Sequence, residues 1–271
     1  MTTKTPRVDV WIMPTGTIDP VIHRRLYARL DDRERAAHDR HAKEHDRLLY
    51  AAAHALKRHA LLTQFDGAPT SWTFTENAYG KPRLSNPPDG TDPRFNLTHT
   101  PGLVAVAVSN GLDLGLDAEA LDPSHATLDT ASAFAHPSEL RALDPDSPDY
   151  VRKFYRLWTR KEALAKATGL GLSLEVRTLI FADEIDSQWH LHEWDEGDSH
   201  RIALIAALEF GVPEIVTHRI DANDIRRFKT ETILHKTLIY LALENKSSII
   251  CLMRIMDIGF NSSIDCSGVR V

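Results

Sequence analysis

Apolar side chains follow two different patterns along the 271-residue chain, and these patterns predict strands and helices in separate stretches. Short runs of β-branched, aromatic and alternating apolar residues, bounded by glycine, proline or aspartate, are typical of strands. The predicted strands are Val8–Met13, Trp72–Thr75, Leu103–Val108, Leu112–Ala118, Val176–Ala182, Trp189–Trp194, Arg201–Leu208 and Ile215–Ile220. Phe95–His99 is expected to lead into the third strand, and Asn110-Gly111 is expected to form a hairpin turn before the fourth.

Two longer stretches have the composition and spacing of helices. Asp31–Leu62 contains neither glycine nor proline, so it is expected to form one long helix or two close ones. Tyr150–Thr168 is the second helix, and Gly169 and Gly171 stand where its C-cap and the following loop belong. Residues 121–149 hold five Asp and four Pro and are predicted to be a loop with a short helix. Because strands and helices are segregated, the pattern predicts an α+β fold.

The composition changes near the C-terminus. All 14 prolines lie at or before Pro213, and residues 226–271 contain seven isoleucines but one alanine. A divergent helical extension and a tail acquired by frameshift or fusion both explain this change. In either case no function is placed there, and a chain that ends after Asp221 is expected to remain folded and active.

Composition and charge exclude several classes of protein. The chain is 42% hydrophobic and 26% charged, as soluble globular proteins are, and its net charge of −6 does not suit a general nucleic-acid binder. The first 250 residues carry no cysteine, which favours a reducing cytoplasm over a disulfide scaffold. We expect neither a signal peptide nor a membrane span, because no apolar run approaches the length of about 20 residues that a span needs.

Asp117 and Glu119 are the first candidates for chemistry. On a strand, their side chains project to the same face, where two carboxylates repel unless a cation lies between them. Oxygen ligands of this kind suit Mg²⁺. The alternative is a solvent-facing polar edge of a strand.

Glu162 and Lys166 lie one turn apart on the second predicted helix. A surface ion pair explains them, but it does not explain the bulky aromatic residues just before the pair or the glycines just after it. Glu162 would add a third carboxylate to a Mg²⁺ site, and Lys166 would neutralise a phosphate oxygen.

Two further segments carry groups that suit phosphate. Thr98 and His99 stand where a strand begins, and Lys81 lies in a fixed turn. His41 to His45 matches an H-x-x-E-H zinc pattern, but its flanks are charged all round, so a solvated helix face is the preferred interpretation. Arg35 and Arg47 in that region are candidates to bind an anion.

Taken in order, these segments resemble the 4′-phosphopantetheinyl transferase superfamily, Sfp type. The resemblance covers roughly residues 6–221, and the last of its four blocks is the strongest. The matching blocks are Gly80-Lys81-Pro82, Phe95-Asn96-Leu97-Thr98-His99, Gly115-Leu116-Asp117-Ala118-Glu119, and the segment from Phe154 through Lys161-Glu162-Ala163 and Lys166 to Gly169-x-Gly171-Leu172.

The resemblance implies a monomer built from two similar α/β halves in a pseudo-twofold arrangement. The halves would be residues 1–111 and 112–221, followed by an atypical extension, residues 222–271. Coenzyme A and Mg²⁺ would bind in the cleft between the halves. The reaction would transfer the 4′-phosphopantetheine moiety of coenzyme A to a serine of an acyl or peptidyl carrier protein and release adenosine 3′,5′-bisphosphate.

The resemblance also implies roles for individual residues. Asp117, Glu119 and Glu162 would bind Mg²⁺, with Asp117, Glu162 and Lys166 as the catalytic groups. Glu162 or a metal-bound water would take the serine proton, and Lys166 would stabilise or protonate the leaving phosphate. The residues implied to contact coenzyme A are Arg35, Arg47, Lys81, Thr98, His99, Asp117, Glu162 and Lys166.

Two other functions compete with the transferase. One is a non-catalytic paralogue that binds coenzyme A or a carrier protein, and the other is a Mg²⁺-dependent pyrophosphate hydrolase. The presence of all three carboxylates and Lys166 argues against decay of catalysis, and a hydrolase does not explain four matching blocks in order.

Overall fold

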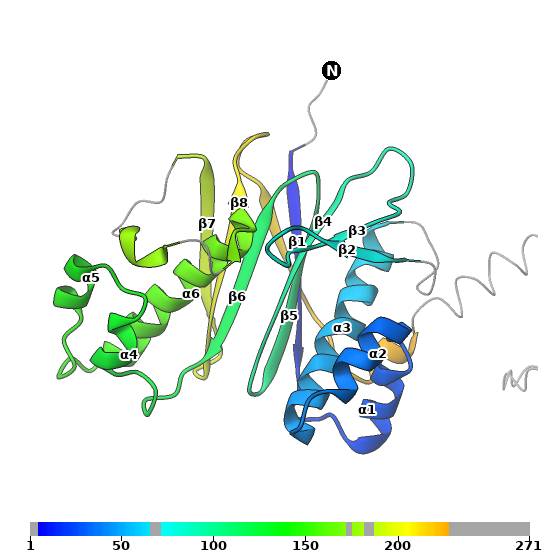
Figure 1. The fold of residues 1–271 in the computed structure, drawn as a ribbon, viewed down its shortest axis with the longest axis horizontal. Coiled ribbons are helices and arrows are strands. Elements are labelled where there is room, and N and C mark those ends of the chain that lie inside the picture. Colours follow the sequence, from blue (N-terminus) through cyan, green and yellow to red (C-terminus); the bar gives the residue numbers. More distant parts are fainter. Residues whose placement is uncertain (1–4, 66–71, 172–174, 182–186, 228–271) are drawn as a thin grey trace, which may run out of the picture. The chain divides into compact units, whose positions relative to one another are not determined.

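A computed structural model describes residues 5–65, 72–171, 175–181 and 187–227 of the chain (Figure 1). The strands are β1 (Arg7–Pro14), β2 (Phe74–Glu76), β3 (Pro82–Leu84), β4 (Pro93–Thr100), β5 (Leu103–Asn110), β6 (Leu114–Ala120), β7 (Trp189–Glu196), β8 (His200–Ala207) and β9 (Glu214–Arg219). The helices are α1 (Pro20–Tyr27), α2 (Asp32–Asp39), α3 (Glu44–Gln64), α4 (Leu128–Ser132), α5 (Pro137–Ala142) and α6 (Tyr150–Thr168), with 3₁₀ turns η2 (Val176–Thr178) and η3 (Asp224–Arg227). No helix of these described segments is long and apolar enough to cross a membrane.

The described strands form two main sheets with the same internal topology. The first sheet has the order β4-β5-β1-β9 and the second has the order β6-β8-β7, while β2 and β3 pair with each other. In both sheets the first strand in sequence pairs antiparallel with the third, and the third pairs antiparallel with the second. A long helix, α3 or α6, comes between the first and second strands each time. The predicted α+β class is confirmed, and it takes the form of two similar halves.

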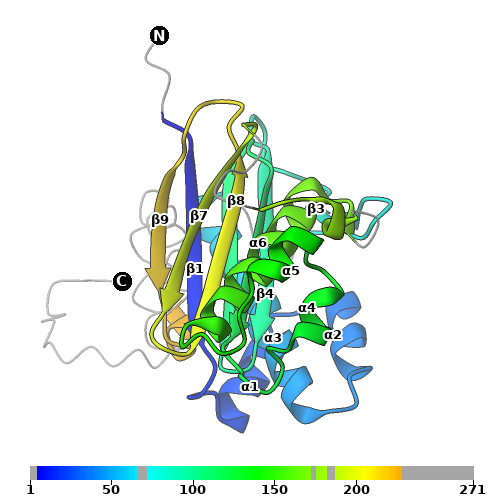
Figure 2. The same cartoon turned by 90° about the vertical axis from the view of Figure 1, so that its left-hand side faces the viewer.

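The apolar faces of the two sheets meet in one core, and the long helices cover the sheets. Alternate residues of β1 and β6, such as Val10 and Leu116, are fully buried in this shared core. Figure 2 shows the helices gathered on one side of the strands. Residues of β6 at the intervening positions therefore face α6.

β4 and β6 lie along the seam between the sheets, where side chains replace the usual strand pairing. Three alternate side chains of β4 accept hydrogen bonds from backbone N–H groups of β6. The pairs are Asn96 with Leu116 at 2.9 Å, Thr98 with Ala118 at 3.3 Å, and Thr100 with Ala120 at 3.0 Å. These bonds satisfy buried backbone donors that no neighbouring strand serves on this side of β6.

The helix predicted over Tyr150–Thr168 has those same bounds in the structure, and Gly169 caps it in the left-handed conformation. Asp31–Leu62 forms two close helices, α2 and α3, which is the second of the two predicted alternatives. The predicted loop at residues 121–149 contains two short helices, α4 and α5. α1 was not predicted from the sequence.

Two predicted local structures are wrong. Asn110-Gly111 does not close a hairpin, because β5 pairs with β4 and β1 while β6 starts the second sheet. The Gly111 N–H instead donates to the carbonyl of Asp92, beside the start of β4. Val176–Thr178 forms a 3₁₀ turn rather than a strand, because one ammonium group, that of Lys161, binds the carbonyls of both Val176 and Leu179. Ala182, at the end of that predicted strand, lies outside the described residues.

Phe95–His99 belongs to a strand of its own, β4, rather than a lead into the next strand. β4 turns at Pro101-Gly102 and pairs antiparallel with β5 over its full length.

The division into 1–111, 112–221 and 222–271 stays a prediction, and two observations bear on it. β9 follows the second sheet in sequence but pairs with β1 of the first sheet, in parallel. Ala222 and Ile225 are 3% and 4% exposed, and the Ile225 carbonyl accepts a hydrogen bond from Arg29. Contacts group residues 1–226 into one unit, and residues 228–271 of the predicted extension lie outside the described residues.

Gly115 allows β6 to lie directly against α6. A Cβ atom at this position would stand 2.0 Å from the carbonyl oxygen of Ala163 and 2.3 Å from the amide of Ala167, both of them backbone atoms that cannot move aside locally. We expect Gly115→Ala to lower the free energy of unfolding by about 3 kcal/mol or more, measured by urea denaturation. Gly16→Ala is the matched control, because open space surrounds that position, and it should change stability by less than about 0.5 kcal/mol. Equal stability of the two variants would contradict this account of the β6–α6 contact.

The residues that end the first unit give a second prediction, for two shortened chains. A chain that ends after Asp221 lacks Ala222 and Ile225, whereas one that ends after Arg227 keeps both. We expect the shorter chain to be less stable by about 2–3 kcal/mol, because burying one isoleucine contributes roughly that much. Thermal unfolding of both chains measures the difference. Equal midpoints would show that these two side chains do not complete the core.

Candidate active site

Strand alternation in β6 places two carboxylates beside α6. Leu116 and Ala118 point into the core between the sheets, so Asp117 and Glu119 project to the opposite side. Glu162 and Lys166 lie one turn apart on α6. β6 and α6 thereby bring together the residues that were predicted from the sequence to bind metal and to act in catalysis.

Lys166 and Asp117 form the shortest contact of this group. The Nζ atom of Lys166 lies 2.6 Å from Asp117 Oδ1 and 3.2 Å from the carbonyl oxygen of Leu116. Asp117 is 3% exposed, and its second carboxylate oxygen, Oδ2, has no hydrogen-bond partner among the described residues. An acceptor that is buried without a donor is costly, so this oxygen is available to a cation.

Burial and the crowding of negative charge raise the pKa values of the other two carboxylates, Glu119 and Glu162. Burial, together with the negative charges of Asp117 and Glu162, raises the pKa of Glu119 to about 7, although Lys166 acts in the opposite direction. Burial and the charge of Asp117 also raise the pKa of Glu162. One lysine therefore does not compensate three carboxylates, and the site favours additional positive charge.

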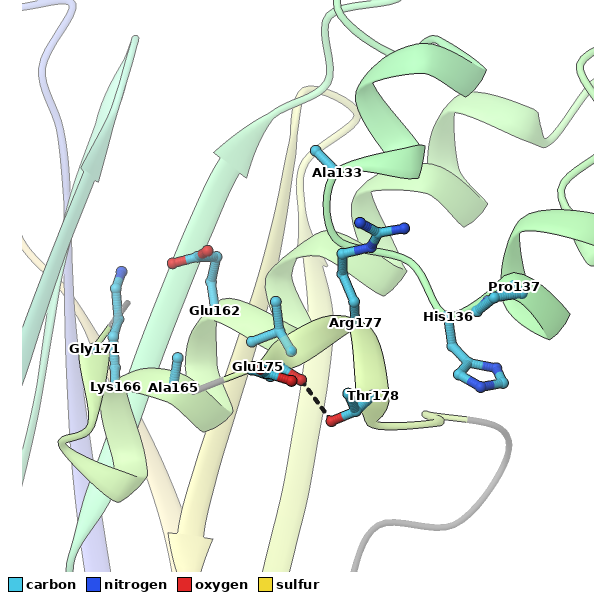
Figure 3. A pocket seen from close by; sticks show the side chains of 11 residues that line it. Ala133, His136, Pro137, Glu162, Ala165, Lys166, Gly171, Glu175, Arg177 and Thr178 are labelled. Carbon is cyan, nitrogen blue, oxygen red and sulfur yellow. Dashed lines mark hydrogen bonds between the residues drawn. The ribbon is translucent and has the colours of Figure 1, made fainter. Parts of the chain in front are cut away.

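An open pocket of about 1000 Å³ adjoins this cluster (Figure 3). Glu162, Ala165 and Lys166 of α6 form one wall, and Figure 3 shows Glu162 and Lys166 rising from the same side of the helix. The other lining residues come from the α4–α5 junction and from the segment around η2, and they are Ala133, His136, Pro137, Gly171, Glu175, Val176, Arg177 and Thr178.

The far walls of this pocket are fixed by a buried ion pair that the sequence analysis missed. Lys161 is 1% exposed, and its Nζ lies 2.9 Å from a carboxylate oxygen of Glu139. Lys161 also binds the carbonyls of Val176 and Leu179, each at 2.7 Å, and Glu139 accepts the amide of Phe181. A positional signal was present: Lys161 falls on the helix face of Phe154, Leu157 and Leu164, where a charged residue needs a buried partner.

The β2–β3 hairpin is clamped to the C-terminal end of α6. Asn77 donates to the carbonyl of Gly169, and Lys81 donates to the carbonyls of Ala167 and Leu114 at 2.8 and 3.0 Å. Burial lowers the pKa of Lys81 to about 8. The ammonium of Lys81 is thus occupied by backbone carbonyls here, and its predicted contact with coenzyme A stays a prediction.

Thr98 and His99 are neighbours on β4, but the first side chain is buried and the second is exposed. Thr98 is 4% exposed and takes part in the seam with β6, and its hydroxyl lies 3.4 Å from Asp117 Oδ1. The His99 side chain is exposed. The pKa of His99 is lowered, first because nearby protein atoms displace water from the imidazole, and second because of the positive charges of Lys166 and His41. His99 therefore lies within electrostatic reach of the carboxylate–lysine cluster.

Arg35 and Arg47 hold local backbone. Arg35 contacts the carbonyl of Ala28 and the carboxylate of Asp32, and its Nε is buried without a hydrogen-bond partner among the described residues. Arg47 donates to the carbonyl of His41 at 2.9 Å. The structure does not join either arginine to the carboxylate–lysine cluster by a contact, so their predicted role stays a prediction.

The oxygen donors of Asp117, Glu119 and Glu162 are of the type that binds a divalent cation, but the distances between them do not form a metal-binding group. Across the ranges of sequence that the structure describes, no three His, Cys, Asp or Glu side chains are placed together to hold a metal ion. Lys166 stands against Asp117, where a cation would compete with it. The unpartnered Asp117 Oδ2 and the raised pKa values of Glu119 and Glu162 nevertheless mark an oxygen-rich site that lacks positive charge.

The structure combines two repeated α+β halves with a strand, β6, whose carboxylates face the Glu–Lys helix α6. The family model for the 4′-phosphopantetheinyl transferase superfamily matches residues 113–209, which contain Asp117, Glu119, Glu162 and Lys166. This match agrees with the resemblance that the sequence predicted.

Several curated relatives carry the same family name. A Synechocystis sp. protein named as a 4′-phosphopantetheinyl transferase is 28% identical over 200 residues, which cover 73% of this chain and 79% of the relative. The 4′-phosphopantetheinyl transferase Sfp of Bacillus subtilis is 31% identical over 155 residues, or 57% of this chain and 65% of the relative. The 4′-phosphopantetheinyl transferase HetI of Nostoc sp. is 29% identical over 176 residues, or 64% and 73%.

The raised pKa of Glu119 gives a prediction for the pH dependence of stability. Its value is 4.5 in the unfolded chain and about 7 in the folded protein, so ionising this carboxyl costs the folded state free energy as pH rises through that interval. We expect Glu119→Gln to gain roughly 1–3 kcal/mol of stability relative to the unmodified protein between about pH 5 and pH 8. Urea unfolding in EDTA at both pH values measures this gain. Glu175→Gln, at an exposed carboxylate that lines the adjoining pocket, is the control, and equal pH dependence in all three proteins would contradict the assignment.

Proposed function

We propose that this chain transfers the 4′-phosphopantetheine moiety of coenzyme A to a serine hydroxyl of an acyl or peptidyl carrier protein. Adenosine 3′,5′-bisphosphate is the second product. The observation that carries the proposal is the cluster of Asp117, Glu119, Glu162 and Lys166, which lies within the segment that matches the superfamily. Two of its members, Glu162 and Lys166, line an open pocket. The names of the relatives support the same reaction.

Asp117, Glu119 and Glu162 are the residues we propose to hold Mg²⁺. The unpartnered oxygen of Asp117 and the excess of negative charge support this assignment. When bound, the cation would stabilise the negative charge that develops on the pyrophosphate of coenzyme A.

The side chains of this chain supply the remaining chemistry. In the reaction, the serine oxygen forms a bond to the β-phosphorus while the bond from that phosphorus to the bridging oxygen breaks. Glu162 takes the serine proton, which its raised pKa favours. Lys166 carries the positive charge that stabilises the departing phosphate.

Coenzyme A would be held by groups on both halves. Lys166 and His99, whose pKa is lowered by lost hydration and by the charge of Lys166, are the best supported contacts to its phosphates. Thr98 is shared with the seam, and Lys81, Arg35 and Arg47 would have to exchange backbone carbonyls for phosphate oxygens. We further propose that the enzyme acts in the cytoplasm without a nucleic-acid partner, which the absence of cysteine before Cys251 and the net charge of −6 support. We propose a monomer from the resemblance to the superfamily, and no membrane partner because no long apolar run is present in the sequence.

The reaction is tested by intact-protein mass spectrometry of an apo carrier protein incubated with this chain, coenzyme A and Mg²⁺. The expected result is a gain of one phosphopantetheine on the carrier, lost when EDTA is added. Release of adenosine 3′,5′-bisphosphate without a carrier would indicate a pyrophosphate hydrolase instead. Binding of coenzyme A with no gain on any carrier would indicate the non-catalytic paralogue.

Glu162→Gln tests the proposed general base. We expect it to lower the rate of transfer by about 10²–10⁴-fold while the chain stays folded, because the amide cannot accept the serine proton. Initial rates of carrier modification give the comparison. Glu175→Gln is the matched control, because Glu175 lines the same pocket from the opposite wall. This variant should keep a rate close to that of the unmodified enzyme. Near-normal turnover of Glu162→Gln would overturn the assignment.

A further inference from the structure

Each of two threonines on β4 makes two hydrogen bonds across the seam. The hydroxyl of Thr100 accepts the N–H of Ala120 at 3.0 Å and lies 3.4 Å from Glu119 Oε2. Thr98 repeats this arrangement one step earlier, with Ala118 and Asp117. A hydroxyl has one proton to donate, so once its oxygen accepts a backbone N–H, the nearby carboxylate is the acceptor for that proton.

The two carboxylates differ in how much other support they receive. Asp117 also binds Lys166 at 2.6 Å. For the Glu119 side chain, the described residues supply the hydrogen bond from Thr100 and no second one. Thr100 is 2% exposed, so its hydroxyl is held rigidly at the end of a paired strand.

We propose that Thr100 is a positioning residue that fixes the Glu119 carboxylate for divalent-cation binding by anchoring it to the β4–β6 seam. This inference rests on the proposed function, because that function makes Glu119 a ligand. The backbone bond to Ala120 sets the distance between the strands, and the bond to Glu119 sets the direction of the carboxylate. Hydrogen bonds of this kind to metal ligands affect metal affinity by about 10–100-fold.

The test compares Mn²⁺ binding by the full chain and its variants, read from the electron paramagnetic resonance signal of free Mn²⁺ without coenzyme A or carrier. Thr100→Val keeps the shape of the side chain but removes both hydrogen bonds, and it should weaken Mn²⁺ binding by about 10–100-fold. Thr100→Ser keeps the hydroxyl and should bind within about threefold of the unmodified chain. If Thr100→Val does not fold, Thr100→Ala removes the same hydroxyl and replaces it in the comparison.

Asn96 offers a control for damage to the seam alone. Its side chain accepts the N–H of Leu116 at 2.9 Å but donates to no carboxylate in the described residues. Asn96→Leu should therefore lower thermal stability, as Thr100→Val does, yet leave Mn²⁺ affinity largely intact. In a Glu119→Gln background, Thr100→Val should cause no further loss of affinity, because the group through which it acts is gone.

The outcomes separate this inference from the proposed function. A folded Thr100→Val chain with unchanged Mn²⁺ affinity would overturn the inference, as would an equal loss in Asn96→Leu. A chain that binds Mn²⁺ with the expected pattern but modifies no carrier would overturn the proposed function and leave the role of Thr100 standing. An unmodified chain that binds no Mn²⁺ in this assay yet modifies a carrier would overturn the inference and leave the proposed reaction standing.

Discussion

The structure depends on hydrogen-bond acceptors for the backbone N–H groups of β6 that face the first sheet. Three side chains of β4 perform this task, so β6 stays beside β4 without pairing with it. That arrangement separates the two sheets and leaves one side of β6 for α6 to pack against. Gly115 then lets α6 approach closely enough for Glu162 and Lys166 to reach the level of Asp117.

The parts of the fold that were predictable from sequence are those determined by local periodicity. The bounds of α6 follow from the spacing of its apolar residues and from Gly169, and the shared face of Asp117 and Glu119 follows from strand alternation. Strand pairing was not predictable in this way. Asn110-Gly111 favours a turn whether the following strand, β6, pairs with β5 or joins another sheet. The choice is made by Asn96, Thr98 and Thr100, whose partners lie about 20 residues away in sequence.

The candidate site shows the same division between what is local and what is not. The sequence nominated the carboxylates and Lys166 because their residue types suit phosphate chemistry. It could not show that Lys81 binds the end of α6, or that Lys161 is buried with Glu139, because both contacts join distant segments. It also could not show that one lysine faces three carboxylates, an imbalance that stores unfavourable electrostatic energy where a charged ligand would relieve it.

The parallel pairing of β9 with β1 has a consequence for biosynthesis. The first sheet begins at Arg7 but gains its last strand at Glu214–Arg219, after every strand of the second sheet has been made. During translation, one edge of β1 therefore waits, unpaired, while some 200 residues emerge from the ribosome. The first sheet is therefore completed only after the second has been made, and a nascent chain would need protection of that edge until its final strand arrives.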